Sequence, residues 1–418
     1  MMTQAFYTGI SGLRASSQSI DVISDNLANT STIGFRGYSA EFANMFEEAI
    51  HTNSGGSPVN SSVGVGTSIN SIVMDQSLGV MELSPSANDL AILGDGWFGL
   101  EGNNQTVYTR DGSFTFDENR DLVARDGFFV LGTKGDNITD GVLTQQLTEI
   151  PLSDVGTQEK LSFPPEVYFP PIASSEATFS GNLTLNENTV VSGVPIITST
   201  GDTNNLKLEF KKSVPQVSPG VQWDVTATTQ KPDGSEIYDT KTGVVTFSEL
   251  GALTSNTLTS IDNQGTPVNI NLGTGYDGVI SISAPPSISS YADGVQDGEL
   301  LGYGINRLGE VLATFTNGRQ SNVGQIAIYH FQNDQGLHRV NGVRFSESAN
   351  SGKPIFFQDA DGKNINGTDL ATNLLEGSNV RIEVGLTDLI IMQRAYDSNS
   401  KSITTADQML QKALSMDA

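Results

Sequence analysis

The sequence predicts a mainly β protein with a long α-helix at each end. Glycine accounts for 44 of the 418 residues and only 17% are charged, a composition that favours many turns. Short runs of alternating apolar and polar residues fill the middle of the chain, whereas apolar residues near both ends recur at helical spacing. We therefore expect discontinuous β domains, with the outer one inserted into the inner one, and coiled-coil-like helices at the N and C termini.

Residues 1–30 are predicted to form an N-terminal assembly helix with a narrow apolar row. The row recurs every seven residues, with one extra member near its start: Phe6, Ile10, Leu13, Ile20 and Leu27. The positions that would widen this row are mostly serine. Gly9 and Gly12 each weaken a helix by about 1 kcal/mol relative to alanine. We expect this helix to be marginal on its own.

Residues 366–418 are predicted to contain a linker and a C-terminal assembly helix. Two heptad rows, offset by three residues, run through it: Ile382, Leu389, Tyr396, Ile403 and Leu410 in one, and Met392, Asn399 and Ala406 in the other. Alternating spacings of three and four that continue over several turns predict a helix that packs along its length. No proline interrupts this stretch.

Between the helices, residues 31–84 form a predicted connector, and residues 85–154 with 289–365 form a discontinuous inner β domain. Asp111-Gly112, Asp126-Gly127 and Asn317-Gly318 are typical hairpin turns, because these residue types tolerate positive φ.

Residues 155–288 are predicted to form the inserted outer β domain. Alternating runs such as 207–211 and 222–229 indicate its strands. Proline-rich segments at 163–171 and 283–287 suggest its boundaries.

Composition excludes several classes of function. A formal net charge of -25 argues against nucleic acid and anionic membranes, since both need clustered cations. The chain has no cysteine, which removes disulfides and thiolate chemistry. We expect no membrane insertion, because no apolar run is long enough to span a bilayer. The N-terminus also lacks the pattern of a cleaved signal peptide.

Candidate chemistry is weak, and we predict no catalytic, cofactor-binding or metal site. His330 and His338 lie close in sequence, but no third metal ligand is indicated nearby, and His51 lies in a polar stretch. Residues 356–368 resemble a calcium loop but lack its first acid and its final glutamate. Paired carboxylates of the glycosidase type would need two acids that the sequence cannot identify.

The terminal helices leave several arrangements open. They could pack on each other within a monomer, cap the β body, or pack against other copies of the chain. A two-helix hairpin alone buries little, and narrow rows on helices rich in glycine and serine suit several close neighbours. We favour packing between copies, with ordering on assembly.

Residues 2–42 resemble the N-terminus of bacterial flagellar axial proteins, the rod and hook family. The most recognisable motif lies within DNLANTSTIGFRGYSAEF, residues 25–42, and includes Asn26, Leu27, Ala28, Asn29, Thr30, Gly34, Phe35 and Arg36. Residues 88–132 are similar to the family's second conserved block, and residues 375–414 to its C-terminal helix. The resemblance covers somewhat under half of the chain.

The resemblance implies a non-enzymatic structural subunit of the extracellular flagellum, exported by the type III apparatus without a cleaved signal peptide. The terminal helices would line a flexible helical tube that transmits torque, and the motif would connect them to outer domains. Implied partners are further copies of the chain, the distal rod, the hook cap and the hook–filament junction proteins. Chain length and the inserted domain favour the hook branch of the family.

Two alternatives remain at this stage. One is a distal rod or other hook-like axial subunit, which the content of purified hook–basal bodies would distinguish. The other is an extracellular polysaccharide-binding or hydrolysing β protein, which would stay active as a monomer without its terminal helices.

Overall fold

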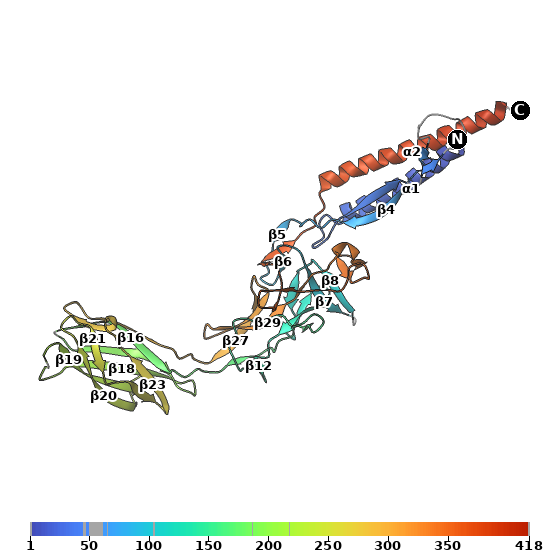
Figure 1. The fold of residues 1–418 in the computed structure, drawn as a ribbon. Helices are drawn as coiled ribbons and strands as arrows, with labels where there is room; N and C mark the ends of the chain where they lie inside the picture. Colours follow the sequence, from blue (N-terminus) through green and yellow to red (C-terminus); the bar gives the residue numbers. More distant parts are fainter. Residues whose placement is uncertain are drawn as a thin grey trace.

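The computed structural model describes residues 2–44, 47–49, 62–64, 66–102, 105–185, 187–216 and 218–416, so His51 lies outside the described residues. The molecule is elongated, with a helical layer at one end, an inner β domain in the middle and an outer β domain at the other end (Figure 1). The predicted mainly β fold with terminal helices is confirmed. Within the described residues, no helix has the length and apolar character needed to cross a membrane.

The helical layer contains α1 (Met2–Ala28) and α2 (Ile382–Met416), which lie side by side in opposite directions (Figure 1). Gly9 of α1 faces Ile403 in the second half of α2, and Leu27 faces Gly385 near the start of α2. The two helices therefore pack on each other within one chain, which is one of the arrangements that the sequence left open.

The predicted connector, residues 31–84, contains a β-hairpin that returns along α1. Its strands β1 (Tyr38–Asn44) and β4 (Thr67–Met74) pair antiparallel. The backbone N–H of Thr67 donates to the Ser11 hydroxyl at 3.3 Å, which fixes β4 beside the helix. Two shorter strands lie between β1 and β4 in the sequence, β2 (Glu47–Ala49) and β3 (Ser62–Gly64), and they pair with each other.

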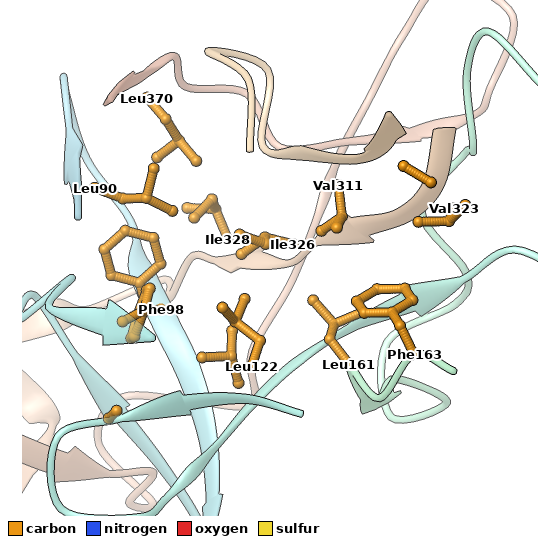
Figure 2. Close-up of a cluster of buried hydrophobic side chains, with 14 of the residues drawn as sticks. Leu90, Phe98, Leu122, Leu161, Phe163, Val311, Val323, Ile326, Ile328 and Leu370 are labelled. Atoms are coloured by element: carbon orange, nitrogen blue, oxygen red, sulfur yellow. The ribbon is translucent and has the colours of Figure 1, made fainter. Parts of the chain in front are cut away.

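The inner domain is built on one large, mostly antiparallel sheet. Its central strands, in spatial order, are β27 (Gly298–Ile305), β28 (Glu310–Phe315), β29 (Gln320–Ile326), β11 (Phe129–Lys134), β7 (Trp97–Gly102) and β8 (Gln105–Thr109). Apolar side chains from these strands and their neighbours meet in the core shown in Figure 2, which includes Leu90, Phe98, Leu122, Leu161 and Ile326. Phe98 and Phe114 pack edge to face with ring centroids 5.0 Å apart.

Two of the three predicted hairpin turns join paired strands. Asp126-Gly127 connects β10 (Leu122–Ala124) to β11, and Asn317-Gly318 connects β28 to β29; both glycines have positive φ. The prediction for Asp111-Gly112 is wrong, because the strands on either side of it pair with other neighbours. Gly112 instead lets the backbone approach Leu90, whose carbonyl oxygen lies 1.9 Å from where a Cβ would be.

The outer domain is a sandwich of two sheets around its own core. One sheet has the order β17 (Thr189–Ile197), β18 (Thr203–Lys212), β19 (Val221–Gln230), β20 (Ile237–Phe247) and β21 (Leu253–Asn256). The other has the order β22 (Ser260–Asn263), β23 (Thr266–Asn271), β16 (Glu176–Thr184), β25 (Asp277–Ile282) and β24 (Gly273–Thr274), with β26 (Ser287–Ala292) also on β16. Trp223 and Phe179 are fully buried between the sheets.

The sandwich begins and ends later than the expected range of 155–288. Strands β14 (Glu159–Lys160) and β15 (Tyr168–Phe169) pair with strands of the inner sheet, so the sandwich runs from Glu176 to Ala292. The first proline-rich segment therefore lies along the inner domain and not at the boundary. Two chain crossings join the domains, held together by an antiparallel bridge between Ile172 and Val295.

Two short antiparallel strand pairs connect the inner domain to the helical layer. Strand β35 (Leu370–Thr372) pairs with β6 (Leu90–Ile92), and β36 (Leu374–Glu376) pairs with β5 (Met81–Leu83). The chain enters and leaves the helical layer through these pairs, so the N-terminal connector and the segment before α2 meet at one place.

Candidate assembly site

The predicted heptad rows of α2 mostly face α1. Five residues are half-buried and one is buried, namely Leu389, Met392, Asn399, Ile403, Leu410 and Ala406. Ile382 and Tyr396, which belong to the same predicted rows, are exposed. The rows thus describe the face of α2 that lies against the helix of its own chain.

On α1 the closest approach to α2 is made by small residues. The predicted apolar residues Phe6, Leu13, Ile20 and Leu27 are half-buried and Ile10 is exposed. The buried positions are Gly9, Gly12, Ala15, Ser16 and Ser19. A Cβ on Gly9 would lie 2.7 Å from Ile403 Cγ1, and one on Gly12 would lie 2.6 Å from Asn399 Nδ2. The glycines that weaken α1 as an isolated helix are the positions that let α2 pack closely.

Several large apolar side chains of the helical layer remain exposed. On α2, Ile382, Leu386 and Ile390 are 51%, 48% and 51% exposed and follow one another at intervals of four residues. Residues four apart lie on the same face of a helix. On α1, Tyr7 and Ile10 are exposed near the free end.

The motif residues at the end of α1 terminate the helix and attach the connector to it. Asn26 accepts a hydrogen bond from the Tyr38 backbone N–H at 2.9 Å and donates to the Tyr38 carbonyl at 2.6 Å. Ala28 is the last helical residue. The Asn29 side-chain amide donates to the Asp25 carbonyl at 2.8 Å, and the Asn29 backbone N–H donates to the same carbonyl at 3.2 Å, so Asn29 closes the last turn of the helix.

Thr30 and Leu27 complete this end of the helix. The Thr30 hydroxyl donates to the Leu27 carbonyl at 3.1 Å. The Leu27 side chain lies against Gly385 of α2, where a Cβ would be 2.9 Å from Leu27 Cδ2. The motif thus fixes both the direction of the connector and the contact between the two helices.

Arg36 lies at the centre of a buried charge cluster. Its Nη2 lies 3.0 Å from Glu376 Oε1, and Arg110 Nη1 lies 3.3 Å from Glu376 Oε2. The three side chains of Arg36, Arg110 and Glu376 are 2%, 4% and 1% exposed. Glu376 Oε1 also accepts the Gly79 backbone N–H at 3.0 Å, and Arg36 donates to the Ser77 carbonyl. One carboxylate therefore compensates two buried guanidinium groups from different parts of the chain.

Arg110 connects this cluster to the inner domain. Burial lowers the pKa of Arg110 to about 10, and the charge of Arg36 acts in the same direction, while the carboxylate of Glu376 opposes the change. The guanidinium carbon lies 5.5 Å from the centre of the Trp97 ring. The Trp97 indole donates to Asp334 at 3.4 Å. The cluster is therefore continuous with the aromatic core of the inner sheet.

Gly34 and Phe35 place the connector against the segment before α2. The Gly34 backbone N–H donates to the Glu376 carbonyl at 2.7 Å. Phe35 is buried, and the Arg339 guanidinium carbon lies 5.2 Å from its ring centre while Arg339 Nη1 lies 2.8 Å from Asp25 Oδ2. Strand β31 (His338–Asn341) thereby contacts the helix end as well.

Gly34→Ala is expected to destabilise this junction by at least 1–2 kcal/mol. Gly34 has φ +68, a conformation that costs a residue with a side chain roughly 1–2 kcal/mol. A Cβ would also lie 2.5 Å from the Asp111 backbone N, which cannot rotate away. Thermal unfolding and hydrogen exchange of residues 33–37 measure the effect. Gly342→Ala serves as control, since φ there is +53 and no atom lies within 4 Å of its Cβ position. Equal losses in both variants would contradict the backbone contact.

Asn379 and Gln335 complete the junction. The Asn379 side chain accepts the Gly37 backbone N–H at 2.8 Å and donates to the Asp75 and Ser77 carbonyls at 2.9 and 3.0 Å. Gln335 bonds both backbone groups of Met74, at 3.0 and 2.9 Å. We name the junction of Arg36, Arg110, Glu376 and Asn379 the connector cluster.

The sequence pointed to Arg36 of the connector cluster but missed its other members. A buried arginine requires a carboxylate, yet the chain holds 47 acidic residues and nothing in their spacing marks Glu376. Arg110 and Asn379 lie in segments that resemble the family, but their roles depend on contacts between residues hundreds of positions apart.

The remaining candidates have structural roles. His330 is buried, its Nε2 lies 2.7 Å from the Asn366 carbonyl oxygen, and burial lowers its pKa. His338 is exposed at the start of β31. The calcium-like segment forms a tight turn in which Asp359 accepts the backbone N–H groups of Asp361 and Lys363. Within the part of the chain that the structure describes, no three His, Cys, Asp or Glu residues are placed to hold a metal ion.

Three protein-family models match the chain at the segments that form this site. They describe the flagella basal body rod protein (residues 6–36), the flagellar hook protein FlgE/F/G D1 domain (91–159) and the flagellar basal body rod FlgEFG protein C-terminal region (371–416).

Relatives of known identity extend the similarity over the whole chain. The flagellar hook protein FlgE of Borreliella burgdorferi is 27% identical over 98% of this chain and 99% of its own. That of Salmonella typhimurium is 27% identical over 97% and 98%, and that of Brucella suis 28% identical over 96% of each. A crystal structure of the Helicobacter pylori flagellar hook protein FlgE2 shares the fold over 71% of this chain and 100% of its own, with TM-score 0.53 and 16% identity.

The matched segments are the terminal helices, the connector beside α1 and the inner β domain, so the similarity points to the class of flagellar rod and hook proteins. Two of the family models are named for basal body rod proteins and one for hook proteins, and the full-length relatives are named flagellar hook protein FlgE. The chain belongs to the flagellar rod and hook protein family.

Proposed function

We propose that this protein is the structural subunit of the flagellar hook, a flexible helical tube that transmits torque from the rod to the filament. The observation that carries this proposal is the apolar surface of the helical layer. Ile382, Leu386 and Ile390 are large, apolar and about half-exposed, and they lie on a helix whose other face already packs against α1. Monomeric proteins rarely expose such rows, and polymerisation would bury them.

The division of the molecule into parts suits a tube that is stiff in torsion and able to bend. The helical layer presents apolar surface for lengthwise packing, whereas the outer sandwich is joined to the rest by only two crossings of the chain. Identical contacts that do not close into a ring produce a helical filament. In this model the helices carry torque, and the outer domains shift relative to one another as the tube curves.

The connector cluster would keep these parts in a fixed relation during rotation. It ties the end of α1, the inner domain and the start of α2 through buried charges and backbone hydrogen bonds. We place the protein at the hook of the flagellum, with the distal rod, the hook cap and the hook–filament junction proteins as further partners. Export would use the flagellar type III apparatus.

Deletion of residues 1–30 and 379–418 tests this proposal. None of the residues in the three hydrophobic clusters of the β body lies in the deleted segments, so we expect the truncated chain to stay folded. It should be monomeric in sedimentation and form no tubes in electron micrographs, whereas the full chain forms them. A full chain that stays monomeric under every assembly condition would contradict the hook assignment. Loss of the β-domain unfolding transitions would show that the helices are needed for the β body to fold.

A further inference from the structure

The helical layer has a second apolar surface at its free end. A groove of about 410 Å³ lies between α1 and β4, and its lining includes Tyr7, Ile10, Ser11, Arg14, Thr67 and Ile69. Arg14 is exposed and makes no ion pair within the described part of the chain. The groove thus has apolar walls with one unpaired cation.

The groove and the exposed row of α2 lie at opposite ends of the same layer. Gly9 beside the groove is level with Ile403, whereas the row is centred on Leu386, near the β body. These two levels are 17 residues apart along α2, or about 25 Å at 1.5 Å per residue. The two surfaces of one molecule therefore cannot contact each other.

The two surfaces are matched in length and charge. The row from Ile382 to Ile390 spans about 12 Å of helix, and the groove follows α1 from Tyr7 to Gln18, about 16 Å. Glu383 lies beside the row at the start of α2, where it could approach the unpaired Arg14 of a facing groove. An apolar ridge with an acidic edge is suited to an apolar groove with a basic residue.

We infer that Ile382, Leu386 and Ile390 of one copy dock in the groove beside Tyr7 and Ile10 of a second copy, shifted by about 25 Å along the helix axis. This inference rests on the proposed function, since it names the contact by which copies would associate. The contact joins two different surfaces, so each bound copy leaves one surface free for the next. Repetition of such a contact gives an open helical array and not a closed dimer.

A disulfide test suits this chain because it contains no cysteine. The variant I10C/L386C is polymerised and then treated with diamide, which takes up the two electrons and two protons of each thiol pair. We expect a ladder of dimers, trimers and higher multimers on a denaturing gel. A disulfide needs Cα atoms within about 7 Å, so linkage within one chain is ruled out by the separation of the two positions.

The single variants I10C and L386C are the controls, and neither should form a ladder or dimers. Dimers from a single variant would overturn the inference, because they require like surfaces to meet. Polymers of the double variant that yield only monomers on the gel would also overturn it, while leaving the hook assignment intact. If I10C/L386C does not polymerise, S68C/I390C probes the same contact from the other wall of the groove, with the same two outcomes.

Discussion

Replacing Glu376 with glutamine is expected to lower the free energy of unfolding of the junction by about 3–5 kcal/mol. The substitution keeps the shape of the side chain but removes the negative charge that faces Arg36 at 3.0 Å and Arg110 at 3.3 Å. Two buried guanidinium groups then lack compensation, and Arg110 already carries a pKa lowered by burial and by Arg36. The loss should appear in the calorimetric transition of the inner domain, while that of the outer sandwich is unchanged.

Glu82→Gln is the matched control for this prediction. Glu82 lies on β5, which pairs with the strand that contains Glu376, but its side chain is exposed. We expect a change of no more than about 0.5 kcal/mol there. Adding Arg110→Met to Glu376→Gln should recover part of the loss, because one buried cation is removed. A loss below 1 kcal/mol for Glu376→Gln alone would be inconsistent with a buried cluster.

Replacing Ile403 with aspartate is expected to abolish polymerisation while leaving both β domains folded. Ile403 lies in the seam between the helices, where its Cγ1 is 2.7 Å from the position of a Cβ on Gly9. A carboxylate cannot be placed there without losing its hydration, so the helices would separate. The helical layer would then no longer present its surfaces to neighbouring copies. Leu389→Asp, in the same seam, should act in the same way.

Sedimentation and electron microscopy measure this effect, and calorimetry reports on the β domains. Thr404→Asp is the matched control. It introduces the same charge at the next position of α2, where the Thr404 side chain is exposed. The control should form tubes. Tubes of normal appearance from Ile403→Asp would refute the seam assignment. Loss of the β-domain transitions would show that the helical layer stabilises the body, contrary to the separation of its hydrophobic clusters.

The helix at each end could be predicted because its pattern is local. The heptads of α2 identified six residues that lie toward α1, since helical periodicity depends only on near neighbours. Ile382 and Tyr396 share that period but are exposed. On α1 the apolar row was visible, but the closest contacts are made by Gly9 and Gly12, which leave room for the side chains of Ile403 and Asn399. Such a contact has no signal in the sequence of α1.

The long-range features were predicted less well for a related reason. The β character of residues 155–288 followed from alternation, but this range also includes β15, which pairs with the inner strand β27. Strand pairing is decided by partners that are distant in the sequence. The local pattern therefore placed the start of the outer sandwich too early. The connector cluster illustrates the same point, because Glu376 contacts Arg36 although the two residues are 340 positions apart in the sequence.

The two crossings between the β domains make the outer sandwich a replaceable module. The chain leaves and re-enters the inner domain beside the bridge of Ile172 and Val295, and Asp293 accepts the backbone N–H groups of Ser175 and Glu176 at 2.8 and 3.0 Å. The sandwich is thus an insertion in the inner domain, and its two ends lie side by side where a loop could otherwise connect them. A foreign domain whose termini lie side by side could take its place, and a tube built from such chimeras would display that domain at every subunit along its outer surface.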